Sequence, residues 1–261
     1  MKPGILLILI TLLTGCATTD EVDPYEDFNR VMFEVNRIGD KIIYKPFGKA
    51  YKAVIPSFAR KGVNNFFDNL TTPRSALNNF LQGKPARGFN ELGRFLFNST
   101  LGIGGLFDIA AAGDMPRYDE DFSQTLAVWG VPDGPYLVIP VWGPRTFLST
   151  ASIPVDFTTD LQRQIGDTGV RDKLYILRLI DTRSRLLTTE EILNKSQDPY
   201  LAFREAYLQN RQYEIYDGNP PVDEDFYYFE EDDEFFEDEE YYEDEELEAD
   251  ESARNAAGSS D

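Results

Sequence analysis

The chain has 261 residues and a formal net charge of −21, from 46 acidic and 25 basic residues. It contains no histidine and a single cysteine, Cys16. This composition excludes Ser-His-Asp and Cys-His catalysis and the usual His/Cys zinc sites. The sequence also lacks a phosphate-binding loop, a dinucleotide-binding glycine motif and a nucleophile elbow. We therefore expect no enzyme, no cofactor and no metal site.

The negative charge is concentrated at the C-terminus. Residues 217–261 hold 21 acidic residues against Arg254, a net of −20, which leaves residues 1–216 with a net of −1. A neutral body argues against nucleic acid as a partner, because phosphate binding needs a basic excess. The acidic runs predict a disordered tail over residues 217–261. Aromatic pairs such as Phe235-Phe236 leave two interpretations of it open, docking on a basic partner or a solvated segment.

The N-terminus has the pattern of an export signal. A basic start is followed by an apolar run from Ile5 to Leu13, which is too short to span a bilayer. The run ends in Leu13-Thr14-Gly15-Cys16, the Leu-x-Gly-Cys pattern of bacterial lipoproteins. The sequence predicts that residues 1–15 form a signal peptide that is removed.

Cys16 is then expected to be the acylated N-terminus of the mature protein, carrying palmitate-like chains. Several acyl chains give stable anchoring, because each buried methylene contributes about 0.8 kcal/mol. Ala17 follows the cysteine, where an aspartate would favour retention in the inner membrane. We therefore expect a lipid-anchored linker over residues 16–22 and a periplasm-facing protein at the outer membrane of a Gram-negative bacterium.

The body between these ends shows mainly helical spacing. We expect a first helix capped by Asp23 and closed by Pro46, with polar residues such as Asn29 between the apolar positions. Residues 174–180 are apolar almost all round, which predicts a helix buried on more than one side. Only residues 136–139 are expected to be extended. Further helices are predicted after Ile55-Pro56, Thr72-Pro73, Lys84-Pro85 and Asp198-Pro199, the last decorated by Arg204 and Arg211.

Two segments interrupt the helical pattern. Residues 101–112 are apolar and rich in small residues, so they form either a packed core segment or a segment resting in a lipid leaflet. Residues 129–144 are rich in glycine, proline and aromatic residues. We predict that they form a mobile loop with Gly130 and Gly134 as hinges and Gly143 at its far end, because glycine tolerates backbone angles that other residues resist. A rigid loop that only packs is the alternative.

Several short strings in chain order resemble one family. They are Asp23-Pro24-Tyr25-Glu26, Asn65-Phe66-Phe67, Asn79-x-Leu81-Gln82-Gly83, Gln124-Thr125-Leu126, Gly134-Pro135-Tyr136 and Asp198-Pro199-Tyr200. Together with the lipoprotein signal they resemble the MlaA (VacJ) family of outer-membrane lipoproteins over residues 23–216. Two positions depart from the family pattern. Ser123 stands where a glycine is usual, and the segment after Gly143-Pro144, beginning at Arg145, lacks the usual Arg-Asp pair.

The resemblance implies an all-α, ring-like domain lying in the inner leaflet of the outer membrane. Family members associate with trimeric porins and pass misplaced phospholipids from the outer leaflet toward a periplasmic shuttle protein. For this chain we therefore expect a non-catalytic phospholipid conduit that maintains lipid asymmetry, with phospholipids, a porin and the shuttle as partners. The alternative is a passive envelope lipoprotein that scaffolds porins or peptidoglycan. A phospholipase would be a third class, and we expect no lipid hydrolysis.

Overall fold

The computed structural model describes residues 22–221, so the signal peptide, Cys16 and nearly all of the acidic tail lie outside the described residues. The described part is mainly helical, as expected. Its helices are α2 (Glu26–Gly39), the π-helix η1 (Asp40–Tyr44), α3 (Lys45–Val54), α4 (Ser57–Leu81), α5 (Pro85–Thr100), α6 (Ile109–Ala112), α7 (Phe122–Val128), α8 (Phe147–Ala151), α9 (Ile153–Thr159), the 3₁₀-helix η2 (Leu161–Gln164), α10 (Thr168–Leu193) and α11 (Pro199–Ile215). A two-stranded antiparallel hairpin joins β1 (Tyr136–Ile139) to β2 (Gly143–Thr146).

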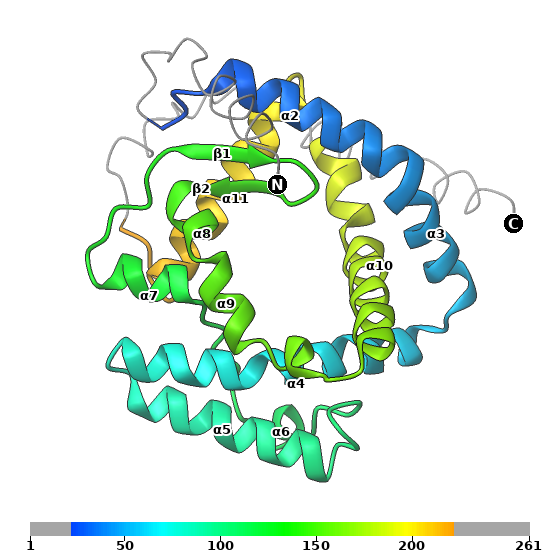
Figure 1. The fold of residues 1–261 in the computed structure, drawn as a ribbon, viewed down its shortest axis with the longest axis vertical. Coiled ribbons are helices and arrows are strands. Elements are labelled where there is room, and N and C mark those ends of the chain that lie inside the picture. Colours follow the sequence, from blue (N-terminus) through cyan, green and yellow to red (C-terminus); the bar gives the residue numbers. More distant parts are fainter. Residues whose placement is uncertain (1–21, 222–261) are drawn as a thin grey trace, which may run out of the picture. The chain divides into compact units, whose positions relative to one another are not determined.

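Within residues 22–220 the helices follow one another around a ring (Figure 1). On one side α2 contacts β1, α3 contacts α10, and α10 contacts both α4 and α11. On the other side α4 contacts α7, α7 contacts α11, and α11 contacts β2. Arg183 of α10 donates to Asp40 of η1 at 2.6 Å, and Lys45 of α3 donates to Glu190 of α10 at 2.8 Å. These ion pairs hold helix α10 against η1 and α3.

Helix α2 is joined to the hairpin by two asparagines that lie seven residues apart on one helix face. The Asn29 amide donates to the Tyr136 carbonyl at 3.0 Å and accepts from the Val138 N–H at 2.8 Å. Asn36 makes the same pair of bonds further along, donating to the Ile139 carbonyl at 2.9 Å and accepting from the Val141 N–H at 2.7 Å. The asparagines therefore act as side-chain substitutes for a neighbouring strand.

The expected role of Asp23 as a helix cap is wrong. Tyr25 occupies the N-cap of α2, and Asp23 lies two residues earlier, fully buried. Asp23 accepts hydrogen bonds from the Asn29 amide at 2.7 Å and from the Tyr200 hydroxyl, and it pairs with Arg204. Its carboxylate thus satisfies donors from α2 and α11 instead of the first turn of its own helix.

Two prolines do not end or begin helices as expected. Pro46 lies in the first turn of α3, directly after the π-helix η1, so the helical path continues past the proline instead of ending there. Pro73 lies inside the single long helix α4. The hydroxyls of Thr71 and Thr72 donate to the Asp68 carbonyl at 2.8 and 3.0 Å. The backbone acceptor that lacks a donor because of Pro73 is the next carbonyl, that of Asn69. The helix starts at Pro85 and Pro199 are confirmed.

The distribution of side chains is the reverse of that in a water-soluble domain. Among the described residues only seven hydrophobic side chains are buried, against 22 polar or charged ones. The polar interior includes Glu91 and Arg94 of α5, and Asp181 and Ser184 of α10. Large hydrophobic side chains instead lie exposed on most helices, and Phe58 is 78% exposed. No described helix is long and apolar enough to cross a membrane.

Helix α10 illustrates this reversal and corrects one expectation. Its apolar residues 174–180 are not buried on more than one side, since Ile176 is 56% exposed and none of them is fully buried. The expectation that Arg211 decorates the surface of α11 is also wrong. Arg211 is buried, and its guanidinium forms a bidentate ion pair with the Asp133 carboxylate, with N–O distances of 3.0 and 3.1 Å.

The segment of residues 101–112 is not a packed core segment. Leu101, Ile103 and Phe107 are each more than half exposed, and only Ala110 is buried among its apolar residues. Asp108 faces inward, where it accepts from Arg94 at 2.9 Å and from the Asn98 amide at 2.9 Å. The segment therefore holds itself to α5 through polar contacts and presents its apolar side chains outward.

A buried carboxylate in this interior predicts a pH-dependent stability. Glu91 is fully buried, and burial raises its pKa to about 7. Between about pH 4.3 and pH 7 the folded chain keeps a proton that the unfolded chain releases, so the free energy of unfolding falls as pH rises, by about 3 kcal/mol. Denaturant unfolding in non-ionic detergent at pH 4.5, 6 and 8 measures this fall.

The variant Glu91→Gln cannot ionise, so its free energy of unfolding should fall less over this pH range by about the same amount. Glu34→Gln, at an exposed carboxylate of α2, is the matched control and should keep the pH dependence of the wild-type chain. Identical pH slopes for the wild-type chain and Glu91→Gln would contradict the assignment.

Candidate functional site

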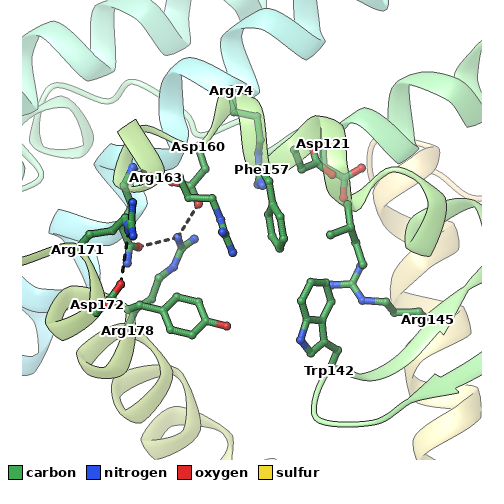
Figure 2. Close-up of a pocket in the computed structure, with 14 residues that line it drawn as sticks. Arg74, Asp121, Trp142, Arg145, Phe157, Asp160, Arg163, Arg171, Asp172 and Arg178 are labelled. Carbon is green, nitrogen blue, oxygen red and sulfur yellow. Dashed lines mark hydrogen bonds and ion pairs between the residues drawn. The ribbon is translucent and has the colours of Figure 1, made fainter. Parts of the chain in front are cut away.

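A polar pocket of about 790 Å³ lies among elements that border the middle of the ring (Figures 1 and 2). Its walls come from α4, the start of α7, the β1–β2 hairpin, α9, η2 and α10. Five arginines and four aspartates line it, together with three aromatic side chains. They are Arg74, Arg145, Arg163, Arg171, Arg178, Asp121, Asp156, Asp160, Asp172, Trp142, Phe157 and Tyr175.

Two of the pocket's arginines are paired with carboxylates. Arg178 donates to Asp160 at 3.1 Å and to the Gln162 side chain at 3.1 Å. The contact with Asp160 is marked in Figure 2. Arg171 lies 3.5 Å from Asp172. The contacts of Arg178 tie η2 and the residue before it to α10 and so form one wall of the pocket, whereas the pair of Arg171 and Asp172 lies within α10.

The acidic side chains of the opposite wall are held by backbone groups. Asp121 caps α7, accepting from the Gln124 N–H at 2.8 Å, and Asp156 accepts from the Phe122 N–H at 3.1 Å. The pKa of Asp156 is raised above its ordinary value, chiefly because burial disfavours the charged form and secondly because Asp121 adds negative charge. These two aspartates therefore position α7 against α9.

The expected loop of residues 129–144 contains the first strand and the turn of the hairpin. Gly130, Gly134 and Gly143 all have positive φ angles, of 90°, 72° and 77°. A side chain at Gly134 would lie 3.0 Å from the Cβ of Phe147, whereas Gly130 and Gly143 face open space. Gly143 begins β2 beside Trp142, which places it next to the pocket, and Gly130 and Gly134 flank the segment that leads into the hairpin.

The two departures from the family pattern occupy defined positions. Ser123 lies inside α7, where it is buried and donates to Asp121 at 2.7 Å. Arg145 lies on β2 and lines the pocket. The pocket as a whole was not predicted from the sequence, which singled out Arg145 only as a departure from the family pattern. The predicted loop of residues 129–144 contributes Trp142 to it. Cys16 lies outside the described residues.

Comparison with known proteins decides the family. The family model described as MlaA lipoprotein matches residues 21–214. The chain belongs to the MlaA lipoprotein family. A curated MlaA relative, the intermembrane phospholipid transport system lipoprotein of Haemophilus influenzae, is 32% identical over 224 residues, covering 81% of this chain and 89% of the relative. The Escherichia coli protein of the same name is 35% identical, covering 82% and 88%.

A solved structure has a fold similar to that of this MlaA family member. It comes from work on the structural basis for maintenance of bacterial outer membrane lipid asymmetry. The two chains are 34% identical and superpose with a TM-score of 0.66, covering 76% of this chain and 99% of the solved one. The ring-like helical fold is therefore that of the family.

Proposed function

We propose that this protein is a non-catalytic phospholipid conduit of the outer membrane. It removes misplaced phospholipids from the outer leaflet and passes them toward a periplasmic shuttle, which maintains lipid asymmetry. The names of the curated relatives support phospholipid transport, and the solved relative supports a role in outer-membrane asymmetry. A trimeric porin and the shuttle are proposed as partners on the family resemblance.

The reversed distribution of side chains carries this proposal. Contiguous exposed apolar surface marks a contact with lipid or with another protein. Here large hydrophobic side chains are exposed on α2, α3, α4, α5 and α10, whereas most buried side chains are polar or charged. Because a helix satisfies its own backbone hydrogen bonds, such a ring is stable in hydrocarbon without crossing it. Acyl chains remain outside while a polar head group moves through the middle, and no bond needs to form or break.

Deletion of the gene is expected to raise the amount of phospholipid in the outer leaflet and the sensitivity of the cells to detergent. The wild-type gene should restore both, and Cys16→Ser should restore neither, because the acyl anchor places the protein at the outer membrane. Labelling of surface-exposed phospholipid in the three strains measures the effect. Unchanged asymmetry in the deletion strain would favour the passive scaffold, and release of lysophospholipid from vesicles by the purified protein would favour a phospholipase.

We further propose that the hairpin moves during transfer, with Gly130 and Gly134 as hinges and Gly143 at its turn. Gly130→Ala adds a side chain at a φ of 90° without a steric clash, which costs about 1–2 kcal/mol. It should slow the release of phospholipid from proteoliposomes several-fold. Gly83→Ala is the matched control, since Gly83 has a φ of 74° and equally open space but lies between α4 and α5. Equal transfer rates for both variants and the wild-type chain would exclude the hinge.

A further inference from the structure

Three arginines of the pocket lack an acidic partner. Arg74, Arg145 and Arg163 form no ion pair within the described residues, although four aspartates line the same pocket. In Figure 2, Arg163 reaches into the pocket from one wall, Arg74 enters from α4, and Arg145 lies with Trp142 at the opposite wall. The pocket therefore holds cationic groups from three separate elements around one space.

Aromatic rings hold the side chains of Arg145 and Arg163 and leave donors unused. The Arg163 guanidinium lies 3.5 Å from the centre of the Phe157 ring, and that of Arg145 lies 5.5 Å from the centre of the Trp142 ring. One terminal nitrogen of Arg145 donates to the Ser149 carbonyl at 3.3 Å. The Nε atoms of Arg74 and Arg145 are buried and make no hydrogen bond with any described residue. Stacking orients a guanidinium while its N–H groups remain available to an anion.

The nearby carboxylates compensate this positive charge only in part. Arg74 and Arg145 act on Asp156 through their charge, which opposes the effect of burial on its pKa, but they form no ion pair with it. Asp160 and Asp172 are taken by Arg178 and Arg171. Asp121 and Asp156 accept backbone N–H groups, and neither lies within ion-pair distance of the three free arginines. A buried donor without a partner costs about 1–3 kcal/mol, so an anion that accepts from these groups would be stabilised.

The size and walls of the pocket point to a phosphodiester that carries an apolar group. A volume of about 790 Å³ falls in the range of sites for small organic ligands, roughly 300–1,000 Å³, and far exceeds the needs of inorganic phosphate. Trp142, Phe157 and Tyr175 supply apolar surface beside the arginines. Arginine also matches the geometry of phosphate oxygens better than a point charge does.

We propose that Arg74, Arg145 and Arg163 bind the phosphodiester of a phospholipid head group inside the ring, with the aromatic walls contacting its glycerol and the first acyl carbons. This assignment rests on the proposed function, because it identifies the pocket as a binding site for the transported lipid. It names the phosphate as the recognised group. Lipids with different head-group alcohols are therefore accepted, and lipids without phosphate are not.

The test is the binding of short-chain lipid to the full-length acylated protein in dodecyl maltoside, measured by titration calorimetry. Dihexanoyl phosphatidylglycerol and dihexanoyl phosphatidylcholine should both bind, and dihexanoylglycerol should not. Arg145→Gln and Arg163→Gln should each weaken binding about tenfold, as expected for one charge-assisted hydrogen-bonding group. Arg171→Gln, in the same pocket but paired with Asp172, is the matched control and should stay within about twofold.

Circular dichroism and the unfolding midpoint verify that each variant is folded. The double variant that carries both Arg145→Gln and Arg163→Gln tests the site without a substitution at Arg74, whose replacement inside α4 could prevent folding. Unchanged affinity in that double variant would overturn the site. Inorganic phosphate that displaces the lipid at equal concentration would reassign the pocket to free phosphate. A deletion strain with normal asymmetry would refute the proposed function while leaving the binding result to decide the site. Normal complementation by a variant that cannot bind would place the site off the transport route.

Discussion

Replacement of Asn29 by alanine is expected to lower the free energy of unfolding by about 3–5 kcal/mol. The substitution removes three hydrogen bonds, to the Asp23 carboxylate and to the Tyr136 and Val138 backbone groups. Each bond contributes about 1 kcal/mol, and each buried backbone group left without a partner costs about 1–3 kcal/mol. Urea unfolding in non-ionic detergent, followed by circular dichroism, measures the change.

Asn36→Ala provides the matched control for this prediction. It removes the equivalent pair of backbone contacts, to the Ile139 carbonyl and the Val141 N–H, but Asn36 is partly exposed, so water replaces the lost partners. We expect a loss of about 1 kcal/mol. Equal losses at both positions would show that burial of the Asn29 network does not hold the hairpin. Because the hairpin carries Trp142 and Arg145, Asn29→Ala should also weaken short-chain lipid binding.

The helices could be predicted from the sequence because their apolar residues recur at helical spacing. Which face of each helix is buried could not be predicted. Val31, Val35 and Ile38 recur at helical spacing on α2, yet each is at least half exposed. Asn29, which lies between the apolar positions, is fully buried. Spacing reports a difference between two faces of a helix, not which face meets the solvent. In α2 the usual assignment of the apolar face to the core is reversed.

The pocket could not be predicted because its residues are distant in sequence. Arg74 and Arg178 are brought to one space only by the contact between α10 and α4. Isolated arginines and aspartates in a body of near-neutral charge have no spacing that distinguishes them from surface residues. The buried pair of Arg211 and Asp133 shows the same limit, since 78 residues separate its members. Tertiary contacts, which periodicity does not encode, decide both cases.

The family motifs supplied what periodicity could not. The strings that contain Asp23 and Tyr200 predict family membership, and the structure gives them a common reason that also involves Asn29. These three side chains meet in one buried hydrogen-bonded cluster that joins α2 to α11. The Asp23-Pro24-Tyr25 and Asp198-Pro199-Tyr200 strings therefore mark the place where the ring closes, in addition to two helix starts.

Charged substitutions on the apolar exterior are expected to abolish most of the intrinsic membrane affinity of the ring. Val54 and Phe58, 75% and 78% exposed, lie where α3 leads into α4. If both side chains enter lipid, each contributes about 1.5–3 kcal/mol, and a carboxylate in their place adds a further penalty. Val54→Asp with Phe58→Asp should therefore reduce vesicle partitioning at least about 100-fold.

Flotation of the chain beginning at Ala17 with phospholipid vesicles measures this partitioning, because that chain lacks the acyl anchor. Gln209→Asp with Gln212→Asp adds the same charge at exposed polar positions of α11 and is the matched control. It should float as the unsubstituted chain does. If both pairs of substitutions left flotation unchanged, the exposed residues would not enter lipid. A protein partner would then have to cover them, and the acyl chains on Cys16 would be the only attachment to the membrane.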